Sequence, residues 1–334
     1  MSRRRGPRGA ATGLIGAVLA AGGARGAYAL LRSGPPGGAA TWTRTNHRGE
    51  PVTLLEGPAA ATGAALAAAL NPGLPARTRA ALVTAAAGAG ALGGYDDLAG
   101  SGDRRGFRGH LGALAQGEVT TGAVKIGGIG ATGLAASALL GGGPVDVAVN
   151  AGLIAGGANL LNLFDLRPGR AIKVAALAGG MIAATGRPAG GAVPGATLAG
   201  IPLGAALALL DEDLGERAML GDAGANALGA MLGAAAAASL PRSGRVAVLA
   251  GIVALTAASE KISFTKVIQR TPPLHWLDML GRRPAAVPAG GSPAATPGPD
   301  RTGHEGTSPE GPGPEGTGTA TDQPATPRTS ASPP

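Results

Sequence analysis

The sequence predicts an all-α membrane protein: a polytopic bundle of about nine or ten transmembrane helices followed by a disordered tail. Of its 334 residues, 45% are hydrophobic and only 14% are charged, whereas soluble domains carry about 25% charged residues. The hydrophobic residues gather in long blocks of Ala, Gly, Leu and Val that short polar clusters separate. Most blocks approach the roughly 20 residues that a helix needs to cross a bilayer.

Nine apolar blocks follow one another along the chain. Helices suit them better than barrel strands because the blocks lack a period-two alternation, and Gly and Ala allow close helix packing in a membrane. The short second block is either a span that begins near Val52, with Glu56 at the water boundary, or a half-buried or re-entrant segment. The blocks cover residues 10–31, 58–70, 80–95, 120–140, 144–164, 171–186, 190–210, 223–240 and 245–259.

The chain divides into a membrane domain, residues 1–283, and a tail, residues 284–334. The tail is rich in Pro, Gly, Thr and Ser and has almost no large apolar side chain, so it cannot offset the entropy cost of ordering. The absence of Cys excludes disulfides and Cys-based metal sites, and only four His argue against a His-based site. Despite a net charge of +8, the basic residues form no stripe, which argues against nucleic-acid binding.

Nine crossings would place alternate connections on the same face of the membrane. Of the 15 Asp and Glu residues outside the tail, 14 fall in one set of connections, and Asp146 alone falls in the other. The same set holds more Lys and Arg, so the positive-inside rule predicts that it faces the cytoplasm. The Arg-rich N-terminus argues for the opposite orientation, and a signal-peptide-like site lies near Ala29; an uncleaved first span is expected. The acidic connections are residues 41–57, 95–118, 159–173, 211–226 and 259–283.

Two of these connections carry polar groups at the ends of apolar blocks. Asp96 and Asp97 are either a solvated helix end or a site that binds a cation or accepts a proton. Asn159, Asn162 and Asp165 are spaced by three and share one helix face. They hydrogen-bond either a ligand, such as a nucleobase or sugar, or a neighbouring helix.

A Gly-Asp-Ala-Gly-Ala-Asn segment opens the eighth block. Asp222 within it is either a helix N-cap or a Mg²⁺ ligand beside phosphate-binding backbone N–H groups. Lys125 and Lys173 are two of only four Lys in a chain that otherwise uses Arg, and each lies about a turn inside the start of an apolar block. They are either snorkelling anchors or phosphate contacts.

The ordered set of motifs resembles the polyprenyl-phosphate N-acetylhexosamine-1-phosphate transferase family over roughly residues 41–283. This family includes the phospho-N-acetylmuramoyl-pentapeptide transferases and the undecaprenyl-phosphate GlcNAc-1-phosphate transferases. The segments YDDLAG, NLLNLFD and GDAGANALGAMLG resemble its three acidic signatures, and RTNHRGEPVTLLEG resembles its early cytoplasmic loop.

The resemblance implies a Mg²⁺-dependent enzyme of the bacterial cytoplasmic membrane that acts in cell-envelope glycan synthesis. It would transfer a sugar-1-phosphate from a UDP-sugar to a polyprenyl phosphate and release UMP. Asp222 would be the principal Mg²⁺ ligand with Asp97, and Asp96 would contribute to the metal–phosphate site or to deprotonation of the lipid phosphate. The implied substrate-binding residues are Asn159, Asn162, Asp165, Lys125, Lys173, Arg170, His47 and Arg48.

Departures from the family pattern support an alternative, a non-catalytic membrane scaffold or regulator derived from the family. The family's Lys after the Asp pair and its late His-rich loop are missing, and Pro168 replaces its second Asp in the middle motif. An ion or solute carrier is a weaker alternative because few polar groups lie near block centres. The sequence leaves open the sugar, the polyprenol, the pathway and the oligomeric state, including a homodimer.

Overall fold

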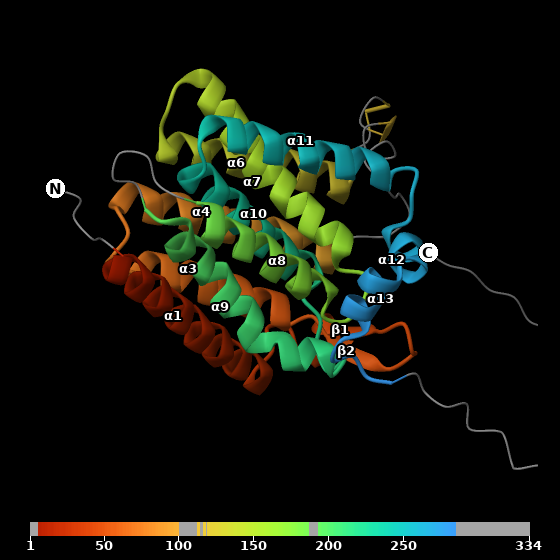
Figure 1. Cartoon of the computed structure of the whole chain (residues 1–334). Helices are drawn as coiled ribbons and strands as arrows, with labels where there is room; N and C mark the ends of the chain where they lie inside the picture. Colours follow the sequence, from red (N-terminus) through yellow and green to blue (C-terminus); the bar gives the residue numbers. More distant parts are fainter. Residues whose placement is uncertain (1–5, 100–111, 114–115, 118, 187–192, 285–334) are drawn as a thin grey trace, which may run out of the picture. The chain divides into compact units, whose positions relative to one another are not determined.

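The structure is a computed structural model that describes residues 6–99, 112–113, 116–117, 119–186 and 193–284. The chain divides into two units, Met1–Ala285 and Ala286–Pro334, and every described residue belongs to the first. The predicted tail beyond Pro284 and most of the connection after Asp97 therefore lie outside the described residues. The described residues are mostly helical and include one short pair of strands, which confirms the predicted helical fold (Figure 1).

Within the described part of the chain, nine long helices follow the nine predicted blocks. One of them, Thr121–Leu140, has a capping signal at each end: the Thr120 side chain accepts a hydrogen bond of 3.1 Å from the N–H of Ala123, and Gly141 with φ +83° follows the last residue. The helices are α1 (Gly6–Ser33), α3 (Glu56–Leu70), α4 (Ala76–Ala99), α6 (Thr121–Leu140), α7 (Pro144–Phe164), α8 (Arg170–Thr185), α9 (Gly195–Leu214), α10 (Gly221–Ser239) and α11 (Arg242–Ser259).

Five of these helices are long and apolar enough to cross a membrane: α1 from Thr12, α6, α7, α9 and α11. They mark the chain as a membrane protein. Among the others, α3 and α8 have only 15 and 16 residues, and α10 is enclosed by other helices. The predicted nine or ten spans would require these helices to cross the bilayer as well.

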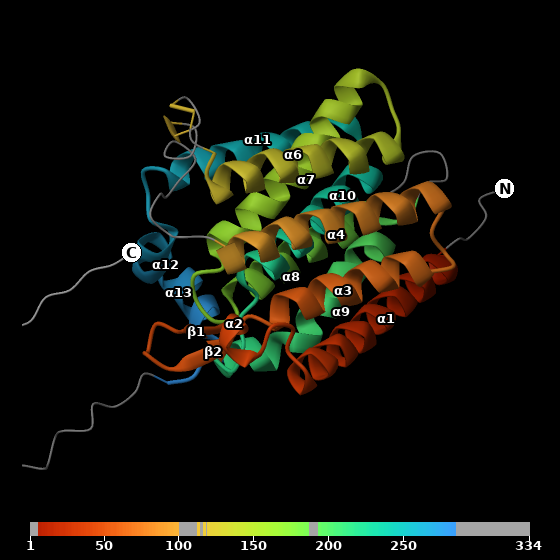
Figure 2. The same cartoon turned by 180° about the vertical axis from the view of Figure 1, so that it is seen from behind.

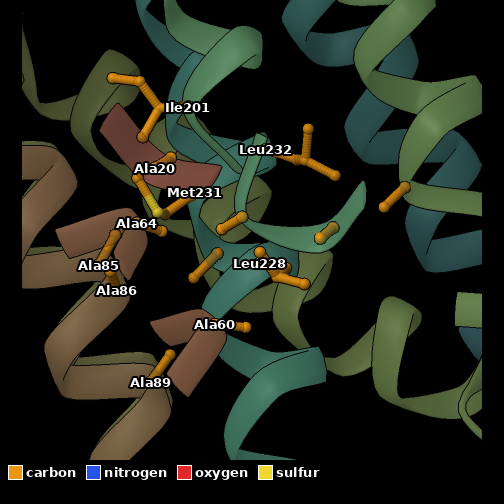
Figure 3. Packing of buried hydrophobic residues seen from close by; sticks show 14 of the residues in the cluster. Ala20, Ala60, Ala64, Ala85, Ala86, Ala89, Ile201, Leu228, Met231 and Leu232 are labelled. Carbon is orange, nitrogen blue, oxygen red and sulfur yellow. The ribbon is translucent and has the colours of Figure 1, made fainter. Parts of the chain in front are cut away.

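Helix α10 forms the centre of the bundle, where it packs against α7, α4, α3, α9 and α8 (Figures 1 and 2). Nearly all its residues are buried. Small residues make this possible: a Cβ on Gly229 would lie 2.3 Å from the carbonyl oxygen of Gly157 on α7. Figure 3 shows Leu228 and Met231 of α10 among alanines such as Ala60 and Ala85.

A small hairpin precedes helix α3 and was not predicted. Helix α2 (Ala39–Trp42) leads into β1 (Thr43–Thr45), which pairs antiparallel with β2 (Pro51–Thr53). Thr53 also forms a parallel bridge to Ala218, just before α10, and this contact ties the hairpin to the centre of the bundle. The second apolar block therefore does not begin near Val52, which lies in β2. Helix α3 begins at Glu56, and the Glu56 side chain is fully buried instead of lying at a water boundary.

Two short helices follow α11, namely α12 (Phe264–Arg270) and α13 (Pro272–Met279). Both lie at the end of α11 that is near the β1–β2 hairpin (Figures 1 and 2). The stacked rings of Phe264 and Phe164, with centroids 4.9 Å apart, join α12 to the end of α7.

Candidate functional site

The predicted Asp pair lies against the N-terminus of α10. Asp97 accepts hydrogen bonds from two backbone N–H groups, with distances of 3.0 Å from Asp222 to Oδ1 and 2.9 Å from Ala223 to Oδ2. A carboxylate of α4 thus caps a neighbouring helix and stabilises its positive dipole end. Gly221 has φ +57°, and a Cβ there would lie 3.0 Å from Asp97 Oδ2, so both its conformation and its contacts favour glycine.

Lys125 of α6 connects Asp96 to Asp222. Its Nζ lies 3.3 Å from Asp96 Oδ2 and forms an ion pair with Asp222 Oδ2, and the two carboxyl side chains also contact each other. All three side chains are largely buried, with 13% of Lys125, 20% of Asp96 and 24% of Asp222 exposed. We call Asp96, Asp97, Lys125 and Asp222 the acidic cluster. It contains three carboxyl groups and one ammonium group.

Asp165, at the end of α7, extends the acidic cluster. It accepts a hydrogen bond from the backbone N–H of Gly221, so that two carboxyl groups hold the N–H groups of residues 221–223. Its Oδ2 is buried and has no hydrogen-bond partner among the described residues. Burial raises the pKa of the Asp165 carboxyl well above its usual range, and the negative charges of Asp213, Asp222 and Asp97 raise it further.

Two more buried carboxyl groups near Asp165 were not predicted as site residues. Glu56 is 0% exposed, and neither of its carboxyl oxygens has a hydrogen-bond partner within the described part of the chain. Asp213 is 3% exposed, and its Oδ2 also lacks a hydrogen-bond partner among the described residues. Burying a carboxyl group without partners is costly. Asp213 follows Asp211 and Glu212 in an acidic run typical of a solvated helix end, so only its position at the end of an apolar block could have indicated burial.

A cavity of about 270 Å³ with charged and polar side chains in part of its wall, here called the polar cavity, opens beside these carboxyl groups. It lies between the hairpin, the connection from α7 to α8, and the end of α9, and Asp165, Asp213 and His47 line it. His47 Nδ1 lies 3.7 Å from Glu216 Oε2, and Arg48 Nε donates to Glu216 Oε1 over 2.9 Å. Burial lowers the pKa of His47, although the Glu216 charge opposes this shift.

A second, mainly apolar cleft of about 500 Å³ lies between α6, α7 and α11. Lys125 and Asn159 line it at the end where α6 begins and α7 ends. The Asn159 amide donates to Thr256 Oγ1 of α11 over 3.5 Å. Asn226 of α10 also lines the cleft; it is 0% exposed, and its amide atoms have no hydrogen-bond partner among the described residues. The cleft therefore combines apolar walls with a polar end at the acidic cluster.

Asn162, predicted to share a helix face with Asn159 and Asp165, is half-buried near the end of α7. Its backbone carbonyl accepts a hydrogen bond of 3.0 Å from the N–H of Asp165, which ends the helix. It thus lies three residues before Asp165 along the chain, with its carbonyl engaged in the helix end.

Arg170 and Lys173 bind α13 instead of the acidic cluster. Arg170 forms two hydrogen bonds with the Asp278 carboxylate, 2.7 Å from Nε and 3.1 Å from Nη2, and Lys173 Nζ donates to the Asp278 carbonyl over 2.7 Å. Burial alone would raise the pKa of Asp278, but hydrogen bonding and the charge of Arg170 lower it below its usual value. The structure thus gives Arg170 and Lys173, both predicted to bind substrate, a structural partner about a hundred residues away.

The acidic cluster has the ligand chemistry for Mg²⁺ in part. Within the described residues, no group of three or more His, Cys, Asp or Glu is arranged to hold a metal ion. Mg²⁺, however, commonly binds one or two carboxylates together with substrate phosphates and water. The side chains of Asp222 and Asp96 contact each other and fit this role. Both oxygens of Asp97, in contrast, already accept backbone hydrogen bonds.

No model of a known protein family matches the chain, and no curated protein matches it significantly. The two cavities and the acidic cluster between them are the features of the described residues that bear on function. Their geometry combines three features: an apolar cleft, a buried lysine among carboxylates, and a polar cavity beside the same helix N-terminus.

Proposed function

We propose that the protein transfers a sugar-1-phosphate from a UDP-sugar to a polyprenyl phosphate in a bacterial cytoplasmic membrane, in the synthesis of a cell-envelope glycan. An oxygen of the lipid phosphate bonds to the sugar-bearing phosphorus, the bond from that phosphorus to UMP breaks, and UMP leaves. The observation that carries this proposal is the apolar cleft that ends at Lys125, between Asp96 and Asp222.

The cleft supports a lipid acceptor with a charged end. Its walls come from Ile129, Gly152, Leu249 and Val253 and suit an isoprenoid chain. Lys125 would place a positive charge where the phosphate of such a lipid ends. Neutralisation matters because two phosphate-bearing reactants repel each other, and positioning supplies much of the remaining acceleration.

The polar cavity supports a donor nucleotide. Buried oxygens of Asp165 and Asp213 lack donors among the described residues, and the imide and hydroxyl groups of a nucleoside are donors. Asp222 and Asp96 would hold Mg²⁺ between the cavity and the cleft. The ion would supply charge neutralisation at the phosphates. Asp97 would position Asp222 by capping α10.

UMP release from protein in lipid nanodiscs, supplied with Mg²⁺, polyprenyl phosphate and a panel of UDP-sugars, tests the proposal. Asp222→Ala should lower turnover about 10²-fold or more because it removes the carboxylate beside the reacting phosphates. Asp211→Ala is the matched control, since Asp211 is a 59% exposed acid on α9 that pairs with Arg25. Equal UMP release from wild type and Asp222→Ala would refute the assignment.

One observation favours a second candidate, a non-catalytic scaffold in envelope synthesis. Asp97, Arg170 and Lys173, three of the predicted site residues, have structural partners within the chain. Simultaneous Asp96→Asn, Asp97→Asn and Asp222→Asn substitutions distinguish the candidates. A cell whose envelope depends on the protein should lose that function if the protein is an enzyme and keep it if the folded variant acts as a scaffold.

A further inference from the structure

The segment after α11 presents large apolar side chains to its surroundings. Trp276 is 67% exposed, more than any other large apolar side chain of this segment. This surface differs from the exposed apolar faces of the long helices, which are expected wherever a helix crosses a bilayer. We call it the C-terminal apolar surface; it comprises Ile262, Val267, Leu274, Trp276, Met279 and Leu280.

This segment is too short to cross a membrane. Helix α12 has 7 residues and α13 has 8, whereas a span needs about 20. The preceding helix α11, however, is one of the five that are long and apolar enough to span. Because α11 ends at Ser259 and α12 begins at Phe264, the segment starts close to the membrane boundary of α11.

Ion pairs hold the segment close to the end of α11 where it starts. The buried pair of Arg170 and Asp278 fixes α13 to the first turn of α8, and Arg282 adds a second guanidinium group 3.0 Å from Asp278 Oδ2. Arg283 pairs with Glu50 of the β1–β2 connection. The segment therefore cannot move freely into water, and its apolar side chains stay near the ends of the spanning helices.

The charge of the segment complements an anionic surface. Lys261, Lys266 and Arg270 are exposed, whereas the Asp278 carboxylate is buried in its ion pairs. Basic residues beside exposed Trp and Leu are typical of helices that lie in the headgroup region, where an indole ring has one apolar side and one polar group. Anionic headgroups attract each such Lys or Arg.

We propose that the C-terminal apolar surface lies in the headgroup region of the membrane that α11 crosses, with Trp276 as its anchor and with Lys261, Lys266 and Arg270 on anionic lipid phosphates. The occupant of the surface is therefore the lipid bilayer. The proposal is independent of catalysis, because it rests on the exposure, the length and the charge of α12 and α13.

Tryptophan fluorescence provides a direct test because the chain has only two Trp residues. Trp42 is 9% exposed, and its indole donates to the Pro36 carbonyl over 2.7 Å. In Trp42→Phe, the remaining signal comes from Trp276. Reconstituted in anionic nanodiscs, Trp276 should be quenched strongly by a lipid nitroxide near the headgroup and weakly by one near the bilayer centre. Lys266→Gln with Arg270→Gln should reduce the shallow quenching in anionic lipid but not in zwitterionic lipid.

Three other results would overturn the proposal. Stronger quenching by the deep nitroxide would place Trp276 in the hydrocarbon core. Quenching by aqueous iodide, as for a free indole, would place it in water, and protection from every quencher would mean that protein covers it. Trp276→Phe is the control, since Trp42 should respond to none of the quenchers. If Trp42→Phe fails to fold, the difference between wild type and Trp276→Phe reports the same Trp276 signal.

Discussion

The carboxylate of Asp97 accepts hydrogen bonds from two backbone N–H groups at the start of α10, whereas the adjacent Asp96 pairs with Lys125. Asp97→Asn keeps one acceptor oxygen but loses the second acceptor and the charge. We expect it to lower the free energy of unfolding by about 1–2 kcal/mol. Asp96→Asn leaves the cap intact, so its main effect should be on turnover. Asp97→Asn should therefore be the less stable of the two variants in thermal unfolding. Asp96→Asn should be the less active of the two in UMP release.

The raised pKa of Asp165 predicts that this residue lowers stability at neutral pH. Between the unfolded value of about 3.9 and the higher folded value, the folded state binds more protons, so stability falls as pH rises. Asp165→Asn removes the group whose ionisation lowers stability as pH rises. The asparagine still offers an oxygen to the N–H of Gly221. The variant should gain thermal stability over wild type as the pH rises from about 4 to about 8. A stability difference that does not change with pH would contradict this prediction.

Glycine contacts between helices set how closely α3 can approach α10. A Cβ on Gly57 would lie 2.1 Å from the carbonyl oxygen of Leu220, whereas a Cβ on Gly127 of α6 would meet nothing within 4 Å. Gly57→Ala should therefore destabilise the protein by about 1–3 kcal/mol. Gly127→Ala, the matched control, should raise stability by up to about 1 kcal/mol because alanine favours the helix. Chemical denaturation in one detergent compares the two variants.

The long helices were predictable because the thickness of a bilayer fixes the length of an apolar run, and all nine blocks match a helix. The β1–β2 hairpin could not be predicted, because its position depends on the contact between Thr53 and Ala218, which are far apart in the chain. The motif acids and Lys125 were identified from their positions at block ends. The partners of Arg170 and Lys173 could not be identified, since Asp278 lies in a segment with no recognisable periodicity.

The two ends of the bundle differ in chemistry. The acidic cluster, the hairpin and α13 lie at one end, and at the other end Asp146 pairs with Arg242 and Arg245. Because the chain has no Cys, single cysteines report sidedness without background. Ser33→Cys, at the end of α1, and Ser243→Cys, at the start of α11, are both exposed, conservative changes. An impermeant thiol reagent should label the Ser243→Cys variant from outside intact cells, and the Ser33→Cys variant only after lysis.

Labelling of both variants from the same side would contradict the predicted orientation. It would also remove the argument that all acidic connections face the cytoplasm. The test does not depend on activity, so its result stands whether or not the protein proves to be an enzyme.

The central position of α10 has a consequence for sequence variation. Nearly all its residues are buried against other helices, whereas α11 has no buried residue. Random substitution should therefore be strongly selected against along α10, where a Cβ on Gly229 or Gly233 would already meet backbone atoms of α7. Along α11, exchange of one aliphatic side chain for another should be nearly neutral. Over long evolutionary times the middle of this protein should change slowly while its lipid-facing edge drifts.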